Sequence, residues 1–144
     1  MIVPDVNVLV LGLRPDASDV GERVRTWLER SLAGAEQVGV TEHSLAAMVR
    51  LVTNSRIFRE PSTPQQALDF AQAVLGAPAA LVHRPGPRHW EVFRDLVVGH
   101  RLRGNDVPDA YLAAQVVEAG AHLATLDRGF ARFEGVRTID PLTG

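Results

Sequence analysis

Residues 105–127, NDVPDAYLAAQVVEAGAHLATLD, predict a helix that leads directly into a buried strand. Apolar residues recur at the spacing of one helix face, which predicts a helix from Asp106 or Val107 to Ala119. The run from His122 to Leu126 is largely apolar and predicts a strand. A helix followed at once by a strand is the repeating unit of a parallel α/β sheet.

The same alternation extends toward both ends of the chain. Further strands are expected at 2–3, 38–40, 80–82 and 136–139, and an apolar run continues from Val6 to Leu11. Further helices are expected over 16–33, after Thr41, from about 64 to 75 and up to about Leu102, with a short helical or turning segment at 130–133. These βα units predict a single α/β domain, residues 1–144, with a central parallel sheet flanked by helices.

Two side-chain placements follow from the same spacing. Trp90, Phe93, Leu96 and Val97 fall on one helical stripe and are expected to face the core. The five histidines show no spacing typical of a metal site and are expected to be surface or capping residues.

Composition narrows the class of protein. The chain has 46% hydrophobic and 22% charged residues, which is typical of a globular fold. The absence of cysteine excludes disulfides and cysteine-based zinc sites and fits a cytoplasmic protein. Neither a signal peptide nor a membrane-spanning segment is expected. All fifteen basic residues are arginine, whose planar group suits phosphate, so mechanisms that need a lysine are excluded.

Four acidic residues are expected at one edge of the sheet. Asp5 and Asp127 each follow a strand, while Glu42 and Asp109 each begin a helix. Ligands bind beyond the carboxyl ends of parallel strands, so these positions share one edge. Two carboxylates ~4 Å apart repel by about 4 kcal/mol at an effective dielectric of ~20. The cluster therefore needs a divalent cation, a shared proton or an arginine, and we favour the cation.

Each acid also has a purely structural explanation. Asp5 and Asp127 fit turns, and Glu42 and Asp109 fit helix N-termini. Asp106 fits the N-cap of the helix that contains Asp109. Against capping, Asp109 lies on the apolar face of its helix, where an unpartnered acid is unfavourable. We therefore predict that Asp109 is a metal ligand and that Asp106 is a cap or an outer helper.

Neighbouring polar residues are expected to support this site. Asn7 and Thr125 can orient the acids or a water bound to the metal, and Asn105 and Asp106 precede Asp109. Arg128 and Arg132 follow Asp127 and are expected to hold RNA phosphates or to balance charge.

The order of these motifs resembles the PIN-domain family. The motif set of that family is similar to four features of this chain, which are Asp5-x-Asn7, an acid near the second helix, the stretch Gly104-Asn105 to Ala114 and Thr125-x-Asp127-x-x-Phe130. The stretches from Met48 to Asn54 and from Phe130 to Phe133 look like the VapC toxins of type II toxin–antitoxin pairs.

This resemblance implies a Mg²⁺- or Mn²⁺-dependent endoribonuclease acting on tRNA, rRNA or mRNA. It implies a homodimer inhibited by a VapB-type antitoxin, with Asp5, Asp109 and Asp127 at the acidic positions of the family. Many members carry a glutamate inside the second helix where this chain has Ala47. Glu42 is the nearby substitute.

Three other functions compete. The departure at Ala47 favours a degenerate PIN module that binds RNA or a partner without cleavage. A DNA nuclease would use the same acids. A receiver domain also gathers acids at a sheet edge, but it relies on a lysine that this chain lacks.

Overall fold

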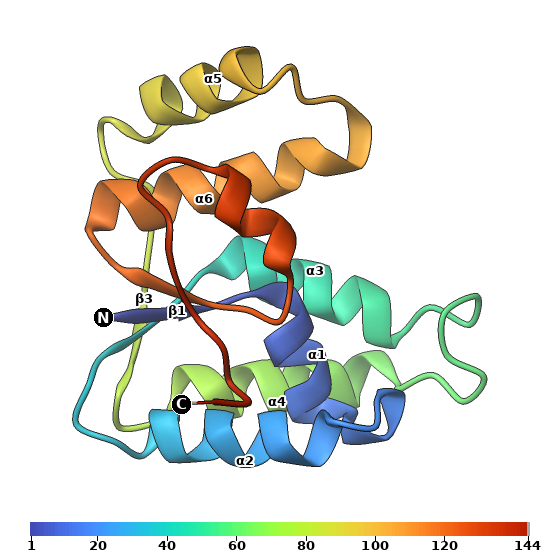
Figure 1. Ribbon diagram of the computed structural model, residues 1–144. Helices are drawn as coiled ribbons and strands as arrows, with labels where there is room; N and C mark the ends of the chain where they lie inside the picture. The colour runs from blue at the N-terminus through green and yellow to red at the C-terminus, as the bar shows by residue number, and fades with distance from the viewer. Residues whose placement is uncertain (144) are drawn as a thin grey trace.

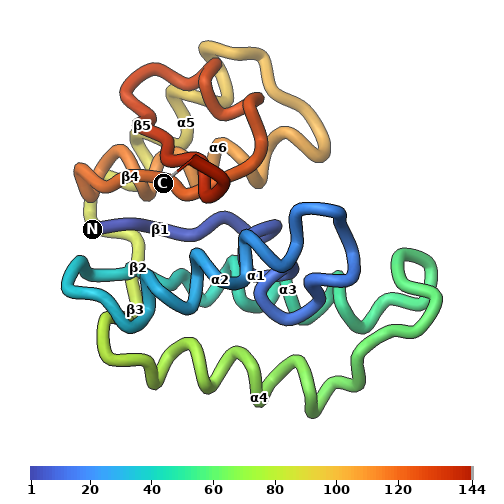
Figure 2. The backbone as a smooth tube through the Cα atoms, turned by 60° about the horizontal axis from the view of Figure 1, so that its bottom comes forward, coloured from blue at the N-terminus to red at the C-terminus, as the bar shows by residue number. Residues whose placement is uncertain are grey.

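The computed structural model describes residues 1–143 as a parallel sheet between two layers of helices (Figures 1 and 2). The five strands lie in the order β3-β2-β1-β4-β5, and all four neighbouring pairs are parallel. The strands are β1 (Ile2–Pro4), β2 (Val38–Val40), β3 (Ala80–Val82), β4 (His122–Ala124) and β5 (Arg137–Ile139). The α/β class with a central parallel sheet is thus confirmed.

Helices cover both faces of the sheet. Helices α1 (Val6–Leu13), α2 (Gly21–Leu32), α3 (Glu42–Val52) and α4 (Pro64–Leu75) lie on one side, and α5 (His89–Gly99) and α6 (Val107–Ala119) lie on the other (Figures 1 and 2). Short 3₁₀ helices span Pro15–Ala17 (η1), Gly104–Asp106 (η2) and Arg128–Arg132 (η3). Each layer buries its own apolar cluster, centred on Leu9 and Met48 in one and on Leu123 and Phe130 in the other.

One helix was not predicted, and two expectations about the helices were wrong. The apolar run after β1 is helix α1, whose period is hidden because every residue from Val8 to Gly12 is buried and none of them is polar. The helix expected over 16–33 begins only at Gly21, because Pro15 starts a separate 3₁₀ turn. Trp90 does not face the core, since 67% of its surface is exposed on α5.

The expected surface position of the histidines was wrong for His89. This side chain is buried, and its Nε2 lies 2.8 Å from the backbone oxygen of Tyr111. No helix within residues 1–143 combines the length and the apolar character that crossing a membrane requires.

The strand order places a switch point between β1 and β4. The chain runs outward from β1 through β2 to β3, and then crosses back to form β4 on the other side of β1. Ligands in open α/β sheets bind beyond the strand ends at such a point. The residues that follow β1 and β4, Asp5 and Thr125, are therefore the first to inspect.

Candidate metal-dependent active site

Asp5 is held rigidly where β1 meets α1. It caps the helix, and its Oδ1 accepts a hydrogen bond from the backbone N–H of Val6 at 2.6 Å. Its Oδ2 accepts a hydrogen bond from the hydroxyl of Thr125 at 2.8 Å. Only 6% of the residue is exposed. Two neighbouring strands of the switch point thus fix one buried carboxylate.

Thr125 connects Asp5 to Asp127. Its Oγ1 accepts a hydrogen bond from the backbone N–H of Asp127 at 3.0 Å while donating to Asp5. The Oδ1 of Asp127 in turn accepts from the N–H of Gly129 at 2.7 Å, at the start of η3. A single hydroxyl therefore sets the relative positions of two acids that are far apart in sequence.

Burial and mutual repulsion disfavour charge on these acids. Burial raises the pKa of Asp5 to about 6, against the lowering effect of the hydrogen bonds from Thr125 and Val6. The charges of Asp109 and Asp127 raise it further. Burial also raises the pKa of Asp109, and Arg132 opposes that shift. The structure thus brings Asp5, Asp109 and Asp127 into one electrostatic environment.

Arg132 lies beside the more open acids. Its Nη2 lies 3.3 Å from Oδ2 of Asp109 and 3.7 Å from Oδ1 of Asp106. Its guanidinium group stacks on the ring of Phe133, 4.5 Å from the ring centroid. Asp106 occupies the N-cap position of α6, but its side chain makes no capping hydrogen bond. The capping alternative for Asp106 was therefore wrong, and its carboxylate pairs with Arg132 instead.

Glu42 pairs with an arginine outside this group. It is the first residue of α3, and its Oε1 forms an exposed ion pair with Nη2 of Arg84 at 3.1 Å. It lines a hollow that also contains His43 and Tyr111, and it is not among the groups that shift the pKa of Asp5 or Asp109.

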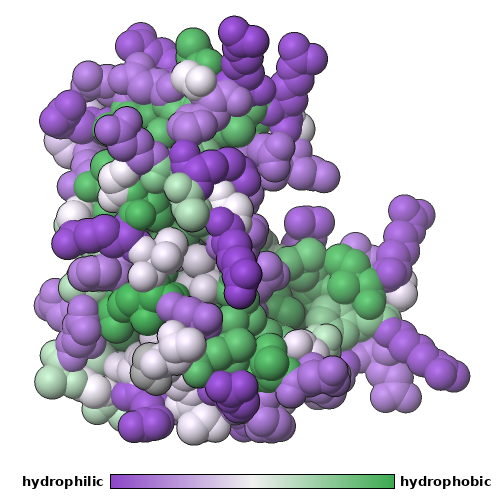
Figure 3. Space-filling model, viewed as in Figure 1, coloured by the Kyte–Doolittle hydropathy of each residue, from purple (hydrophilic) through white to green (hydrophobic). Residues whose placement is uncertain are grey.

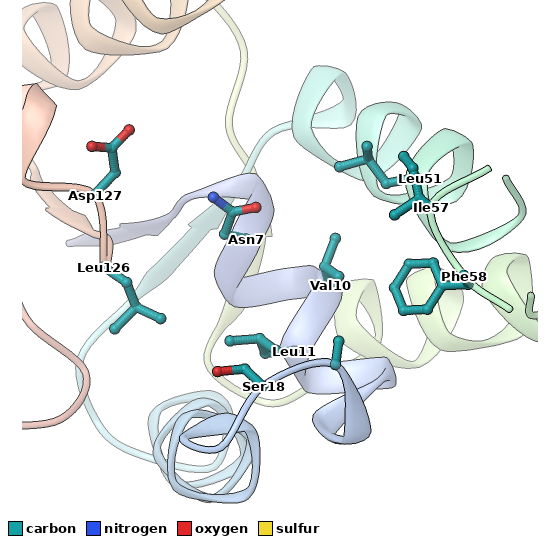
Figure 4. A pocket seen from close by; sticks show the side chains of 10 residues that line it. Asn7, Val10, Leu11, Ser18, Leu51, Ile57, Phe58, Leu126 and Asp127 are labelled. Carbon is teal, nitrogen blue, oxygen red and sulfur yellow. The ribbon is translucent and has the colours of Figure 1, made fainter.

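The remaining supporting residues are exposed. Asn7 lies in the first turn of α1 and lines the same hollow as Asp127 (Figure 4). Asn105 belongs to η2, and Arg128 begins η3 next to Asp127.

The chemistry of the donors fits a hard divalent cation. Asp5 is a buried carboxylate, and none of the ion pairs within residues 1–143 includes it. Carboxylate oxygens are the ligands that such cations prefer. Within the same residues, no three Asp, Glu or His side chains already stand in a metal-binding arrangement. An ion bound by Asp5, Asp109 and Asp127 would therefore require these side chains to rearrange, and Asp127 is exposed while Asp109 is half-buried.

Sequence reasoning missed an apolar hollow beside Asp127. Ile57 and Phe58, in the loop after α3, line it together with Leu51 and Asn7 (Figure 4). Residues 54–63 form neither a helix nor a strand. An apolar pair placed between two arginines was the available signal.

Known proteins share both this sequence and this fold. The family model "PIN domain" matches residues 2–136. The chain belongs to the PIN-domain family. A VapC ribonuclease of Mycobacterium bovis is 44% identical over 144 residues, covering 100% of this chain and 97% of the relative. Ribonuclease VapC25 of Mycobacterium tuberculosis is 40% identical, covering 98% of this chain and 99% of the relative.

A solved structure supports the fold independently. A toxin–antitoxin complex from Klebsiella pneumoniae aligns with a TM-score of 0.63 at 15% identity, covering 98% of each chain. At that identity the likeness concerns the fold alone. The family match and this fold likeness each cover most of the chain.

Proposed function

We propose that this PIN domain is a Mg²⁺- or Mn²⁺-dependent endoribonuclease and the toxin of a VapBC-type toxin–antitoxin pair. The observation that carries the proposal is the buried carboxylate of Asp5, which has no basic partner in residues 1–143 and stands near Asp109 and Asp127. The names of the curated relatives, which are VapC ribonucleases, support RNA as the substrate.

Each residue has a distinct role in this proposal. Asp5, Asp109 and Asp127 would hold the ion, and Thr125 would keep Asp5 oriented through its hydrogen bond. A bound divalent cation would activate a water and stabilise the charge that develops on the scissile phosphate. Arg128 and Arg132 would contact flanking phosphates, because η3 places both next to Asp127. Glu42 stays a candidate for a further acidic role.

Two protein partners are part of the proposal. The Klebsiella pneumoniae neighbour is a toxin–antitoxin complex, which supports a VapB-type antitoxin as the inhibitor. Trp90 and Val98 expose 67% and 71% of their surfaces on α5, which supports a homodimer through an apolar contact. We place the protein in the cytoplasm, where tRNA, rRNA and mRNA are available as substrates.

The test measures cleavage of labelled single-stranded RNA and DNA with Mg²⁺, with Mn²⁺ and with a chelator. The wild type is expected to cut RNA only when metal is present. Asp109→Asn is expected to lose about 100-fold or more in rate, as removal of a charged group from the reacting centre does. Asp69→Asn, which alters an exposed acid on α4, is the matched control and should keep wild-type activity.

Three results would contradict the proposal. Cutting of DNA but not RNA would identify a DNA nuclease. Binding of RNA without cleavage at millimolar metal would identify a degenerate module. Full activity of Asp109→Asn would remove Asp109 from the site.

A further inference from the structure

An apolar trough adjoins the acidic site and has no role in the function described so far. It is a hollow of about 420 Å³ between α1, the end of α3 and the loop that follows. We call it the Ile57 trough; its apolar walls are Val10, Leu11, Leu51, Ile57, Phe58 and Leu126. Figure 3 shows hydrophobic surface gathered in this part of the molecule. Its volume falls within the range of about 300–1,000 Å³ that is common for small-molecule sites.

The Ile57 trough is continuous with the acids. Asp127 and Asn7 line its polar end (Figure 4). The backbone N–H of Asp127 bonds to Thr125, whose hydroxyl bonds to Asp5. A group that fills the trough therefore lies beside a phosphate held at the acids. The amide of Asn7 offers both hydrogen-bond donors and acceptors at that junction.

Two arginines stand close in sequence to the residues at the other end of the trough, where the adjoining hollow also contains Asp16 and Glu60. Arg56 and Arg59 flank Ile57, and Arg59 lines an adjoining hollow that shares Ile57 and Phe58. Neither arginine forms an ion pair with a carboxylate in residues 1–143. Arginines without a carboxylate partner favour binding of a polyanion over binding of an apolar peptide.

Phe58 is held in place from behind. The guanidinium carbon of Arg14 lies 4.5 Å from the centroid of the Phe58 ring. Arg14 itself is committed to Asp16, at 2.8 Å, and to the backbone oxygen of Glu60, also at 2.8 Å. The trough therefore has a fixed aromatic wall, and Arg59 lies beside it in the adjoining hollow.

We propose that the Ile57 trough binds one unpaired nucleobase of the RNA next to the bond that is cut, while Arg59 and Arg56 contact the adjacent phosphates. The inference rests on the proposed ribonuclease function and deepens it. Apolar walls accept the faces of a base, and proteins that bind single strands commonly combine such walls with arginines along the backbone. Base preference at the cut site would then come from the trough and not from the acids.

The first experiment maps where the wild type cuts a 14-nucleotide single-stranded RNA pool of random sequence. Ile57→Ser removes one apolar wall of the trough. The fold is expected to survive, because Ile57 is 52% exposed. Leu68→Ser is the matched control, since Leu68 is 54% exposed on α4 and lies outside the trough. Ile57→Ser is expected to flatten the base preference beside the cut bond and to lower kcat/KM about fivefold. Leu68→Ser should do neither.

The second experiment uses a 12-nucleotide RNA that carries the preferred bond, with each base next to that bond removed in turn. One abasic position should lower kcat/KM about fivefold for the wild type and for Leu68→Ser. The same abasic position should have no further effect on Ile57→Ser, because the contact is already lost.

The outcomes separate this inference from the function on which it rests. If the wild type cuts RNA but Ile57→Ser keeps the base preference and the kcat/KM of the wild type, the base site is overturned and the trough is left to a protein partner. If the abasic effect persists in Ile57→Ser, the base binds elsewhere and the inference is also overturned. If the wild type cuts no RNA, the ribonuclease function and the inference fall together.

Discussion

Two halves of the acidic site manage negative charge in opposite ways. Asp5 is buried and accepts hydrogen bonds from Thr125 and the N–H of Val6, and it forms no ion pair within residues 1–143. Asp109 is only half-buried, and Arg132 stands 3.3 Å from it. Burial without a neighbouring cation makes the charged form of Asp5 unfavourable. Asp109 already has a neighbouring cation, the guanidinium group of Arg132. The need for an external cation is therefore greatest at Asp5.

Asp5→Asn tests the buried half of the site, where the largest effect is expected. The unfolded chain loses the proton of Asp5 near pH 3.8 and the folded chain near pH 6, so stability is lost as the pH rises between these values. Two pKa units correspond to about 3 kcal/mol. In a chelator, Asp5→Asn should be about 3 kcal/mol more stable than the wild type at pH 7.5, and equal to it below pH 4. Urea unfolding across this pH range measures the difference.

The same variant should lose RNA cleavage, because an amide cannot hold a divalent cation as a carboxylate does. Asp69→Asn, at an exposed acid, controls for the change of charge. A wild type whose stability rises between pH 4 and 6 faster than that of Asp5→Asn would contradict the assigned direction of the pKa.

Thr125→Val tests the link between the two acids. It removes the hydroxyl that donates to Asp5 and accepts from the N–H of Asp127, leaving both groups without that partner. A loss of about 2 kcal/mol in stability is expected, together with slower cleavage. Thr125→Ser keeps the hydroxyl and should restore most of both. Equal loss in the two variants would show that the methyl group matters more than the hydrogen bonds.

Glu42→Gln tests the fourth acid, which pairs with Arg84. Its exposed pair with Arg84 is expected to contribute less than about 1 kcal/mol to stability. If Glu42 has the proposed acidic role, cleavage should fall about tenfold, which corresponds to ~1.4 kcal/mol. Arg84→Gln breaks the same pair and is the matched control. An equal loss of activity in both variants would assign the effect to the ion pair and not to the carboxylate.

Much of the fold follows from local signals. The five strands and the helix capped by Thr41 are where the sequence predicts them, since the Thr41 hydroxyl accepts from the N–H of Ser44 at 3.1 Å. Helix α1 was not predicted because it is buried from Val8 to Gly12, so its apolar residues show no alternation with polar ones. Trp90 was misplaced because periodicity defines a stripe but does not reveal where the neighbouring layer ends.

The candidate site was predictable only in part. The parallel-sheet rule brings Asp5, Asp109 and Asp127 to one edge, but it gives no depth of burial. The bond between Thr125 and Asp5 and the pair between Arg132 and Asp109 join residues 120 and 23 positions apart. Such contacts depend on the packing of whole elements. The same reason hid the Ile57 trough, whose walls come from four separate segments.

Arg132→Met tests the open half of the site, where the smallest effect is expected. A divalent cation at Asp109 must displace the guanidinium group, which lies 3.3 Å away. Removing it should lower the Mn²⁺ concentration for half-maximal cleavage about threefold, because the competing charge is gone. KM for RNA should rise about threefold with a shallower salt dependence, because one phosphate contact is lost. Arg132→Lys keeps the charge and should retain the wild-type metal requirement. If Arg132→Met instead needs more Mn²⁺, then Arg132 positions Asp109 for the ion and does not compete with the ion. Both halves of the site would then depend on a fixed side-chain partner.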